Sequence, residues 1–214
     1  MIRRSAARAL ALALALAAAG CVTVGAGGDA PAFTFYSLED LAAATQGERA
    51  ARKIDHVLLV SGPPSSPFYD TTSLAYSRAP GARAYYQFSG WTERPARRIA
   101  QLAERRLIAR GSFDGVASVT AGVRGDLLLN LNLEHLYHDA TREPGSARLM
   151  LVAEMVDWRT RALLDRQVFE YRVPVEQSSA AAAVAGLSRA VTLLLDDLVP
   201  WVERAAAAAP RNAP

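Results

Sequence analysis

An alternation of leucine with mostly polar residues near the middle of the chain constrains the fold more than any other feature. Leu127, Leu129, Leu131 and Leu133 occupy every second position within residues 126–137, and they alternate with Leu128, Asn130, Asn132 and Glu134. Successive side chains of a strand point to opposite faces of a sheet. The pattern therefore predicts a strand with one buried face and one face open to water.

Other segments complete a sheet around this strand. Residues 148–156 are apolar at nearly every position, a turn signal follows them, and aromatic residues then alternate along residues 163–173. A turn at residues 79–82 separates two tyrosine-bearing segments and predicts a hairpin. The remaining predicted strands are residues 33–38, 54–60, 73–78 and 84–88.

Two segments carry apolar residues at helical spacing. Residues 92–110 begin with Thr92, a suitable N-cap, and are followed by Gly111, a suitable terminator. A longer apolar stripe runs from Val184 to Val202. Because strands run together before the last helix, the sequence predicts an α+β two-layer sandwich, with a mainly antiparallel sheet covered by two amphipathic helices.

The N-terminus has the layout of an export signal. Arginines at positions 3, 4 and 8 precede an uninterrupted Ala/Leu run from Ala9 to Ala19, followed by Gly20 and Cys21. The apolar run is shorter than the roughly 20 residues that span a bilayer core. We therefore expect residues 1–20 to be a signal peptide.

Cys21 is the only cysteine of the chain, and small residues precede it directly. This arrangement resembles a bacterial lipobox, in which the thiol is acylated, with palmitate among the expected acyl chains, before a signal peptidase cuts in front of the cysteine. An ordinary secretory signal with a chance cysteine is the alternative. Several acyl chains would hold the protein firmly in a membrane. Val22 stands where an aspartate would favour inner-membrane retention, so we expect the outer membrane, with the protein facing the periplasm.

The mature chain divides into three predicted parts. Residues 21–31 are rich in glycine and alanine and should form the acylated tether. Residues 32–205 have room for one domain with a single core, and residues 206–214 should be a disordered tail.

The charge of the chain argues against nucleic acid as a partner. The whole chain has 24 basic and 21 acidic residues, for a formal net charge of +3. The three arginines before Cys21 account for this excess, so the mature chain is formally neutral. A neutral domain lacks the broad positive field that phosphate backbones attract.

No pattern in the sequence predicts catalysis or a cofactor. There is no Gly-x-Ser-x-Gly elbow and no phosphate-binding loop of the Walker type, so any ATPase should be a separate subunit. His135, His138 and Asp139, with His56 elsewhere, offer the chemistry of a zinc site. Residues three apart in a strand point to opposite faces, however, so we expect a solvated pair of histidines near a turn and no bound metal.

The best candidate contact surface lies around the first helix. Tyr86 and Trp91 precede a segment rich in arginine, including Arg94, Arg97 and Arg98. Guanidinium groups in this setting could bind acidic residues of a partner or lipid phosphates. The alternative is that the aromatics are core residues and the arginines form an ordinary solvated face.

Scattered motifs recur in a fixed order along the mature chain. Each is a small group of aromatics, prolines or an arginine, and none is specific alone. They are Phe35-Tyr36-x-Leu38, Ser66-Pro67-Phe68-Tyr69-Asp70, Tyr76-Ser77-Arg78, Tyr85-Tyr86-Gln87-Phe88-Ser89-Gly90-Trp91 with Pro95, and Phe169 through Pro174 to Ala190, Leu198 and Trp201.

This order, behind a lipobox, resembles the ABC-type transport auxiliary lipoprotein family, whose members are the PqiC-like lipoproteins. The resemblance implies a non-catalytic component of a system that moves lipids between the inner and outer membranes. The implied partners are a periplasmic MCE-domain protein and an ABC permease and ATPase, with phospholipid and a second copy of the chain as further candidates.

Two other functions fit the same leader and fold class. The chain could be a lipoprotein assembly factor or an activator of an envelope machine in the inner membrane. It could also be a lipid-binding shuttle with an internal cavity, which would copurify with phospholipid.

Overall fold

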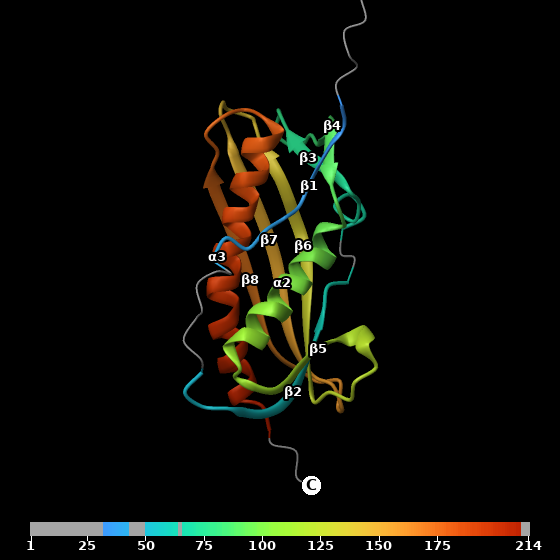
Figure 1. Ribbon diagram of the computed structural model, residues 1–214, viewed down its shortest axis with the longest axis vertical. Coiled ribbons are helices and arrows are strands. Elements are labelled where there is room, and N and C mark those ends of the chain that lie inside the picture. Colours follow the sequence, from blue (N-terminus) through green and yellow to red (C-terminus); the bar gives the residue numbers. More distant parts are fainter. Residues whose placement is uncertain (1–31, 43–49, 64–65, 211–214) are drawn as a thin grey trace, which may run out of the picture. The chain divides into compact units, whose positions relative to one another are not determined.

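Three long strands form the antiparallel meander predicted from the alternating sequence (Figure 1). They are β6 (Leu127–Asp139), β7 (Ser146–Asp157) and β8 (Leu163–Pro174). The leucines at alternate positions of β6 are buried, and Asn130 and Asn132 between them are partly exposed. The period-two prediction is therefore confirmed.

This computed structural model describes residues 32–42, 50–63 and 66–210. The predicted signal peptide and the predicted tether with Cys21 lie outside these ranges. Among the described residues, no helix combines the length and apolar character needed to cross a bilayer.

The second edge of β6 is shared between two groups of strands. At one end, residues 127–130 pair with β2 (Ile54–Ser61), which in turn pairs with β5 (Phe113–Ser118). At the other end, residues 138–139 pair with β3 (Ser73–Ser77). The strands β4 (Ala84–Trp91) and β1 (Thr34–Tyr36) continue from β3 to the edge of the open sheet.

The sheet is mixed, which corrects the prediction of a mainly antiparallel sheet. The pairs β1–β4, β2–β5, β2–β6 and β3–β6 are parallel. The predicted hairpin β3–β4 is antiparallel, as are the two pairs of the meander. Parallel neighbours cannot be joined by a tight turn, so they lie far apart in sequence and leave no local signal.

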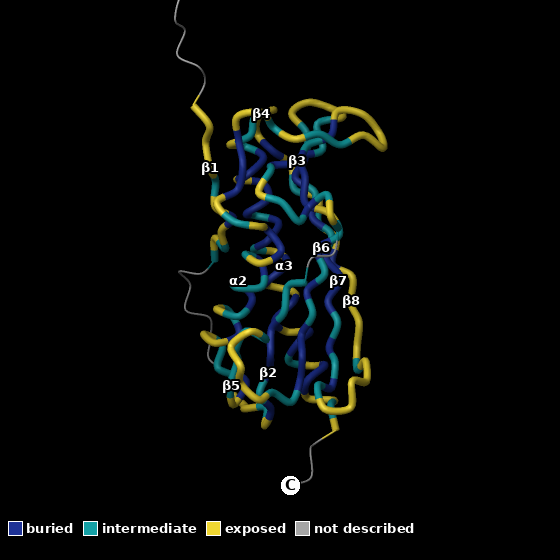
Figure 2. The backbone as a smooth tube through the Cα atoms, turned by 90° about the vertical axis from the view of Figure 1, so that its right-hand side faces the viewer, coloured by how far each residue is buried: buried dark blue, intermediate teal, exposed yellow. Residues whose placement is uncertain are grey.

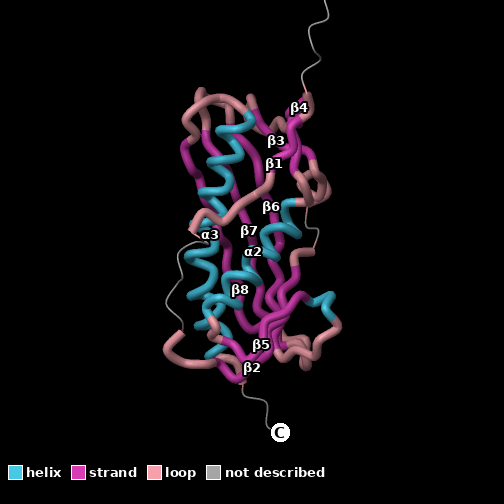
Figure 3. Tube along the Cα trace, in the orientation of Figure 1, coloured by secondary structure: helices cyan, strands magenta, loops and turns pink. Residues whose placement is uncertain are grey.

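The two helices lie on one face of the sheet (Figures 1 and 3). α3 (Ala180–Ala207) packs mainly on β7 and β8, and its predicted apolar stripe is buried. α2 (Pro95–Arg110) packs on β5, β6 and β2. α3 continues through residues 206 and 207, so two residues of the expected tail belong to the helix, and Ala206 is buried.

The ends of α2 match the sequence prediction at one end only. Gly111 ends the helix with a φ of 67° and donates its N–H to the carbonyl of Leu107, as its position predicted. The predicted N-cap, Thr92, is wrong, because Arg94 takes that position and Pro95 begins the helix. Thr92 instead donates its N–H to the carbonyl of Tyr36 and so extends the pairing of β4 with β1.

Burial falls across the meander from β6 and β7 to β8, most of whose residues are exposed (Figure 2). β8 is an edge strand, and its exposed Leu163 and Val168 stand among charged neighbours such as Asp165 and Arg166. Charged side chains on an edge discourage pairing with another chain.

Candidate functional site

The two aromatic residues predicted as contacts lie inside the domain. Trp91 is 2% exposed and belongs to the core. The hydroxyl of Tyr86 lies 2.7 Å from Nδ1 of His138, and burial raises the pKa of this tyrosine although Arg78 opposes the shift. A neutral, hydrogen-bonded Tyr86 therefore helps to join β4 to β6.

His138 is fully buried, which corrects the prediction of two solvated histidines. Its Nε2 lies 3.0 Å from the carbonyl oxygen of Pro144, which can only accept a hydrogen bond. Nε2 therefore donates, and Nδ1 accepts from Tyr86 when the imidazole is neutral. His135 is exposed on the opposite face, as the strand spacing predicted.

The described residues contain no group of three or more His, Cys, Asp or Glu side chains placed to bind a metal ion. His56 is buried in β2, far along the sheet from the end of β6 that holds His138. The three histidines proposed from sequence therefore do not converge.

The three candidate arginines have different surroundings. The Nε of Arg98 donates to the carbonyl of Leu38 at 2.9 Å, and its side chain is only 18% exposed. Arg94 lies 3.4 Å from Asp70 and is 61% exposed, and Arg97 is exposed. Arg94 and Arg97 thus remain available to a partner, whereas Arg98 holds α2 to the segment after β1.

The two exposed arginines line a groove of about 910 Å³, which we call the Arg97 groove. It lies between the first half of α2, the end of β2 and the short 3-10 helix η2 (Val119–Ala121). Ten of its fifteen lining residues are polar or charged, and the charges are of both signs. Its lining residues are Val60, Ser61, Gly62, Asp70, Thr72, Glu93, Arg94, Ala96, Arg97, Ala100, Gln101, Glu104, Ser118, Val119 and Thr120.

The base of the Arg97 groove depends on close packing at Gly62. A Cβ atom at this position would lie 2.7 Å from the carbonyl oxygen of Ala96 and 2.9 Å from Cβ of Ala100. Only glycine allows β2 to end so close to α2. In the sequence Gly62 is followed by Pro63 and Pro64, which indicate only a loop after the strand, so the packing role of Gly62 was not predicted.

The side chains of the groove are suited to binding a polar ligand. Its hydroxyl groups have no histidine or cysteine beside them among the described lining residues, and its carboxylates lie near arginines. Arg97 could form a bidentate pair with a carboxylate or phosphate, and Ser118 and Thr120 could accept or donate hydrogen bonds. Such a site could bind a polar segment of a protein or a lipid headgroup.

The other end of α2 carries an ionic contact that sequence reasoning missed, which we call the Arg106 seam. Arg106 lies 2.7 Å from one oxygen of Asp40 and 2.6 Å from Asp196 on α3. Burial alone would raise the pKa of Asp40, but hydrogen bonds from Arg106 and the N–H of Ala42 bring it below the ordinary value. Asp40 lies between the predicted strands at residues 33–38 and 54–60, in a segment for which the sequence predicted no helix or strand. The sequence therefore contained no indication that Asp40 contacts Arg106.

The next arginine of α2 repeats this arrangement. Nε of Arg110 lies 3.0 Å from Glu203 on α3, which also accepts a hydrogen bond from Ser112. The C-terminal half of α2 is therefore joined to α3 by two ion pairs.

A family model described as the ABC-type transport auxiliary lipoprotein component matches residues 36–199. No curated protein sequence matches the chain. The family match confirms the resemblance drawn from the ordered motifs.

Two solved structures share the fold. One is protein XCC0632 from Xanthomonas campestris, of the DUF330 family, with 18% identity, a TM-score of 0.69, and coverage of 80% of this chain and 96% of that chain. The other is an uncharacterized protein with 12% identity, a TM-score of 0.60, and coverage of 80% and 99%. At these identities the similarity shows the fold alone.

Proposed function

Because the chain belongs to the ABC-type transport auxiliary lipoprotein family, we propose that it serves an ABC transporter that works with an MCE-domain protein to move lipids between the two membranes. In this proposal it is a non-catalytic subunit, anchored by acylated Cys21 to the periplasmic face of the outer membrane. The observation that carries the proposal is the family match over residues 36–199, downstream of residues 1–20, which have the layout of a signal peptide and are followed directly by Cys21.

We assign partner binding to the Arg97 groove. Arg94 and Arg97 are both exposed at the N-terminal end of α2, and the contact of Arg94 with Asp70 leaves its side chain 61% exposed. Arg98, Arg106 and Arg110 are less exposed and bind other elements of the domain. Exposed arginines beside hydroxyl groups suit an acidic surface of the MCE-domain protein.

Crosslinking in cells followed by affinity purification tests this assignment. The wild-type lipoprotein should capture an MCE-domain protein together with its permease and ATPase. The Arg94→Glu/Arg97→Glu variant should capture at least about tenfold less, because like charges would then face the acidic partner. Arg105→Glu/Arg142→Glu is a matched control, since both of these arginines are also exposed.

The outcomes separate the transport proposal from the groove assignment. Capture of no MCE-domain protein by the wild type would contradict the transport proposal, and capture of cell-wall synthesis enzymes would favour an activator of an envelope machine. Equal capture by both double variants would contradict only the assignment of the groove.

The membrane assignment needs a separate measurement. Separation of inner and outer membranes on a density gradient should place the wild type in the outer membrane. Metabolic labelling with a palmitate analogue should mark the wild type and not a Cys21→Ser variant. Recovery of the labelled wild type in the inner membrane would contradict the proposed location.

A further inference from the structure

One edge of the sheet carries no charged side chains. β1 and β4 pair in parallel, with Phe35 beside Gly90 and Tyr36 beside Trp91. Residues 30–38 and 84–92, which contain these two strands, include no Asp, Glu, Lys, Arg or His. Charged residues make up 21% of the whole chain, so this uncharged edge differs from its surroundings.

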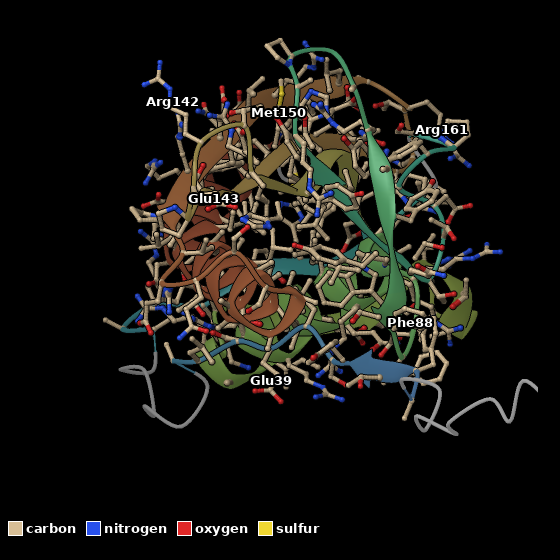
Figure 4. All side chains as sticks on the ribbon, turned by 90° about the horizontal axis from the view of Figure 1, so that it is seen from above. Glu39, Phe88, Arg142, Glu143, Met150 and Arg161 are labelled. Atoms are coloured by element: carbon tan, nitrogen blue, oxygen red, sulfur yellow. The ribbon has the colours of Figure 1, made fainter. Side chains whose placement is uncertain are left out.

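Three exposed phenylalanines lie along this edge, and we call them the Phe35 patch. Phe33, Phe35 and Phe88 are 49%, 62% and 41% exposed. The rings of Phe33 and Phe35 lie 4.8 Å apart, and Phe33 packs over Gly90. Figure 4 shows Phe88 beside β1, so the three residues belong to one surface.

Exposed apolar residues elsewhere have a different setting. Leu163 and Val168 on β8 are also exposed, but charged residues stand on both sides of them in the sequence. A single exposed apolar side chain among charges needs no partner. Clustered aromatics on an uncharged edge indicate a surface that contacts another apolar phase.

The position of the patch in the chain identifies that phase. Only eleven residues separate Cys21 from Phe33, so even a fully extended chain would keep Phe33 within about 40 Å of the anchor. β1 is the first described element after the expected lipid attachment. The uncharged edge is therefore also the part of the described domain that lies closest to the expected anchor along the chain.

We infer that the Phe35 patch inserts into the headgroup region of the membrane that holds acylated Cys21, an inference that rests on the lipidation in the proposed function. Phenylalanine side chains are favoured at this depth because surface-bound segments bury their apolar side chains at the boundary between headgroups and acyl chains. Without lysine or arginine in the patch, its binding does not depend on anionic lipid. The patch and the anchor together fix which side of the domain faces the membrane.

Depth-dependent fluorescence quenching tests this inference on the purified, acylated lipoprotein. The protein is reconstituted into phosphatidylethanolamine and phosphatidylglycerol vesicles that contain brominated phosphatidylcholine. Phe35→Trp reports on the patch, and Leu163→Trp is the matched control, since residue 163 is 56% exposed on β8. The wild-type signal from Trp91, Trp158 and Trp201 is subtracted from both.

Quenching of the added tryptophan should be about threefold greater for Phe35→Trp than for Leu163→Trp, because only the first ring would lie at headgroup depth. Replacing phosphatidylglycerol with phosphatidylcholine should leave this ratio unchanged. Equal quenching of the two variants would overturn the inference, as would a ratio that vanishes without anionic lipid.

Two controls identify what has failed. If the wild-type protein does not float with vesicles, its lipidation is at fault and the proposed function fails with it. The second control addresses self-association. If the protein floats, but the tryptophan of Phe35→Trp is shielded from water equally with and without vesicles and copies crosslink through residue 35, the patch binds a second copy of the chain and the membrane inference is overturned.

Discussion

The two ends of α2 carry the same residue type in opposite roles. At the N-terminal end Arg94 and Arg97 are exposed in a polar groove. At the C-terminal end Arg106 and Arg110 are joined to acids on other elements. Arg94 also lies near a carboxylate, that of Asp70, but its side chain is 61% exposed, whereas that of Arg106 is 21% exposed. The comparison teaches that an arginine becomes structural when the fold brings a carboxylate to it and also covers the pair, which the helix sequence alone does not decide.

The consequences for stability should differ accordingly. Exposed ion pairs contribute little, because water screens the charges and the side chains lose conformational freedom. Asp40 is different, since its side chain is only 2% exposed and would be left in the interior as an unpaired charge without Arg106. We therefore expect the seam to govern folding and the groove to govern binding.

Arg106→Met should have the largest effect on stability. Leaving the buried Asp40 carboxylate without its partner should lower the free energy of unfolding by about 3 kcal/mol. Urea denaturation of the purified protein, followed by circular dichroism, measures this loss. Arg105→Met, at an exposed neighbouring position, should change stability by less than about 0.5 kcal/mol. Equal losses of unfolding free energy in the two variants would show that the Arg106 seam contributes no more to stability than an exposed arginine does.

Asp40→Asn should come next and should depend on pH. Near neutral pH the variant should lose about 2 kcal/mol, because a neutral amide accepts weaker hydrogen bonds from Arg106. The pKa of Asp40 in the folded protein lies below its ordinary value of 3.8, so the carboxylate stabilises the fold fully above that value. This stabilisation is lost as the pH falls through the lowered pKa. Unfolding curves at pH 7 and pH 3 should show the two proteins converging in acid, and a constant difference would contradict this assignment.

Gly62→Ala should have a smaller effect, at the groove end of the helix. The added Cβ would press on the carbonyl of Ala96, and the shift needed should lower the free energy of unfolding by about 1 to 2 kcal/mol. Gly115→Ala is the control, since its Cβ would meet Val57 at an ordinary 3.6 Å. Thermal denaturation of both variants provides the measurement. A loss no larger than that of the control would show that β2 has room to move away from α2.

Arg97→Glu should have the smallest effect on folding. Its side chain is exposed, so the free energy of unfolding should change by less than about 0.5 kcal/mol in the urea titration used for the seam. A loss of unfolding free energy comparable with that of Arg106→Met would show that the arginines at both ends of α2 stabilise the fold, and would contradict the difference proposed between them.

Local pattern predicted those parts of the fold that depend on neighbours in sequence. The alternation in residues 126–137 identified β6, and the turn signal after residues 148–156 placed the hairpin of β7 and β8. Gly111 marked the end of α2 because it alone supplied a left-handed conformation where the apolar stripe stopped. The hairpin of β3 and β4 followed from its turn signal.

Features set by distant residues were not predicted. β5 was missed because Phe113–Ser118 contains a glycine and an aspartate and lacks a run of alternating apolar residues. Its parallel pairing with β2 gives it a place in the sheet that its own sequence does not indicate. In the same way, His138 resembled a turn residue until Tyr86 and Pro144 were found around it.

The candidate site was predicted in part for the same reason. Arginine content pointed to α2, whose N-terminal half lines the Arg97 groove, but Trp91 and Arg98 are occupied within the domain. Their partners come from the core and from Leu38, more than 50 residues earlier. Periodicity identifies the helix face that carries a side chain, and only the tertiary structure shows what lies opposite it.

The segment after β1 also determines how the domain bears a mechanical load. Tension from the membrane would enter at β1, whose pairing with β4 covers only three residues. Such an edge strand can peel away one hydrogen bond at a time. Beyond it, the N–H groups of Glu39 and Leu41 bond to Ser188 and Thr192 on α3, and Asp40 is held by Arg106. If the proposed lipid anchor pulls on the chain, the Arg106 seam would act as a mechanical stop that lets β1 separate from β4 before force reaches the core.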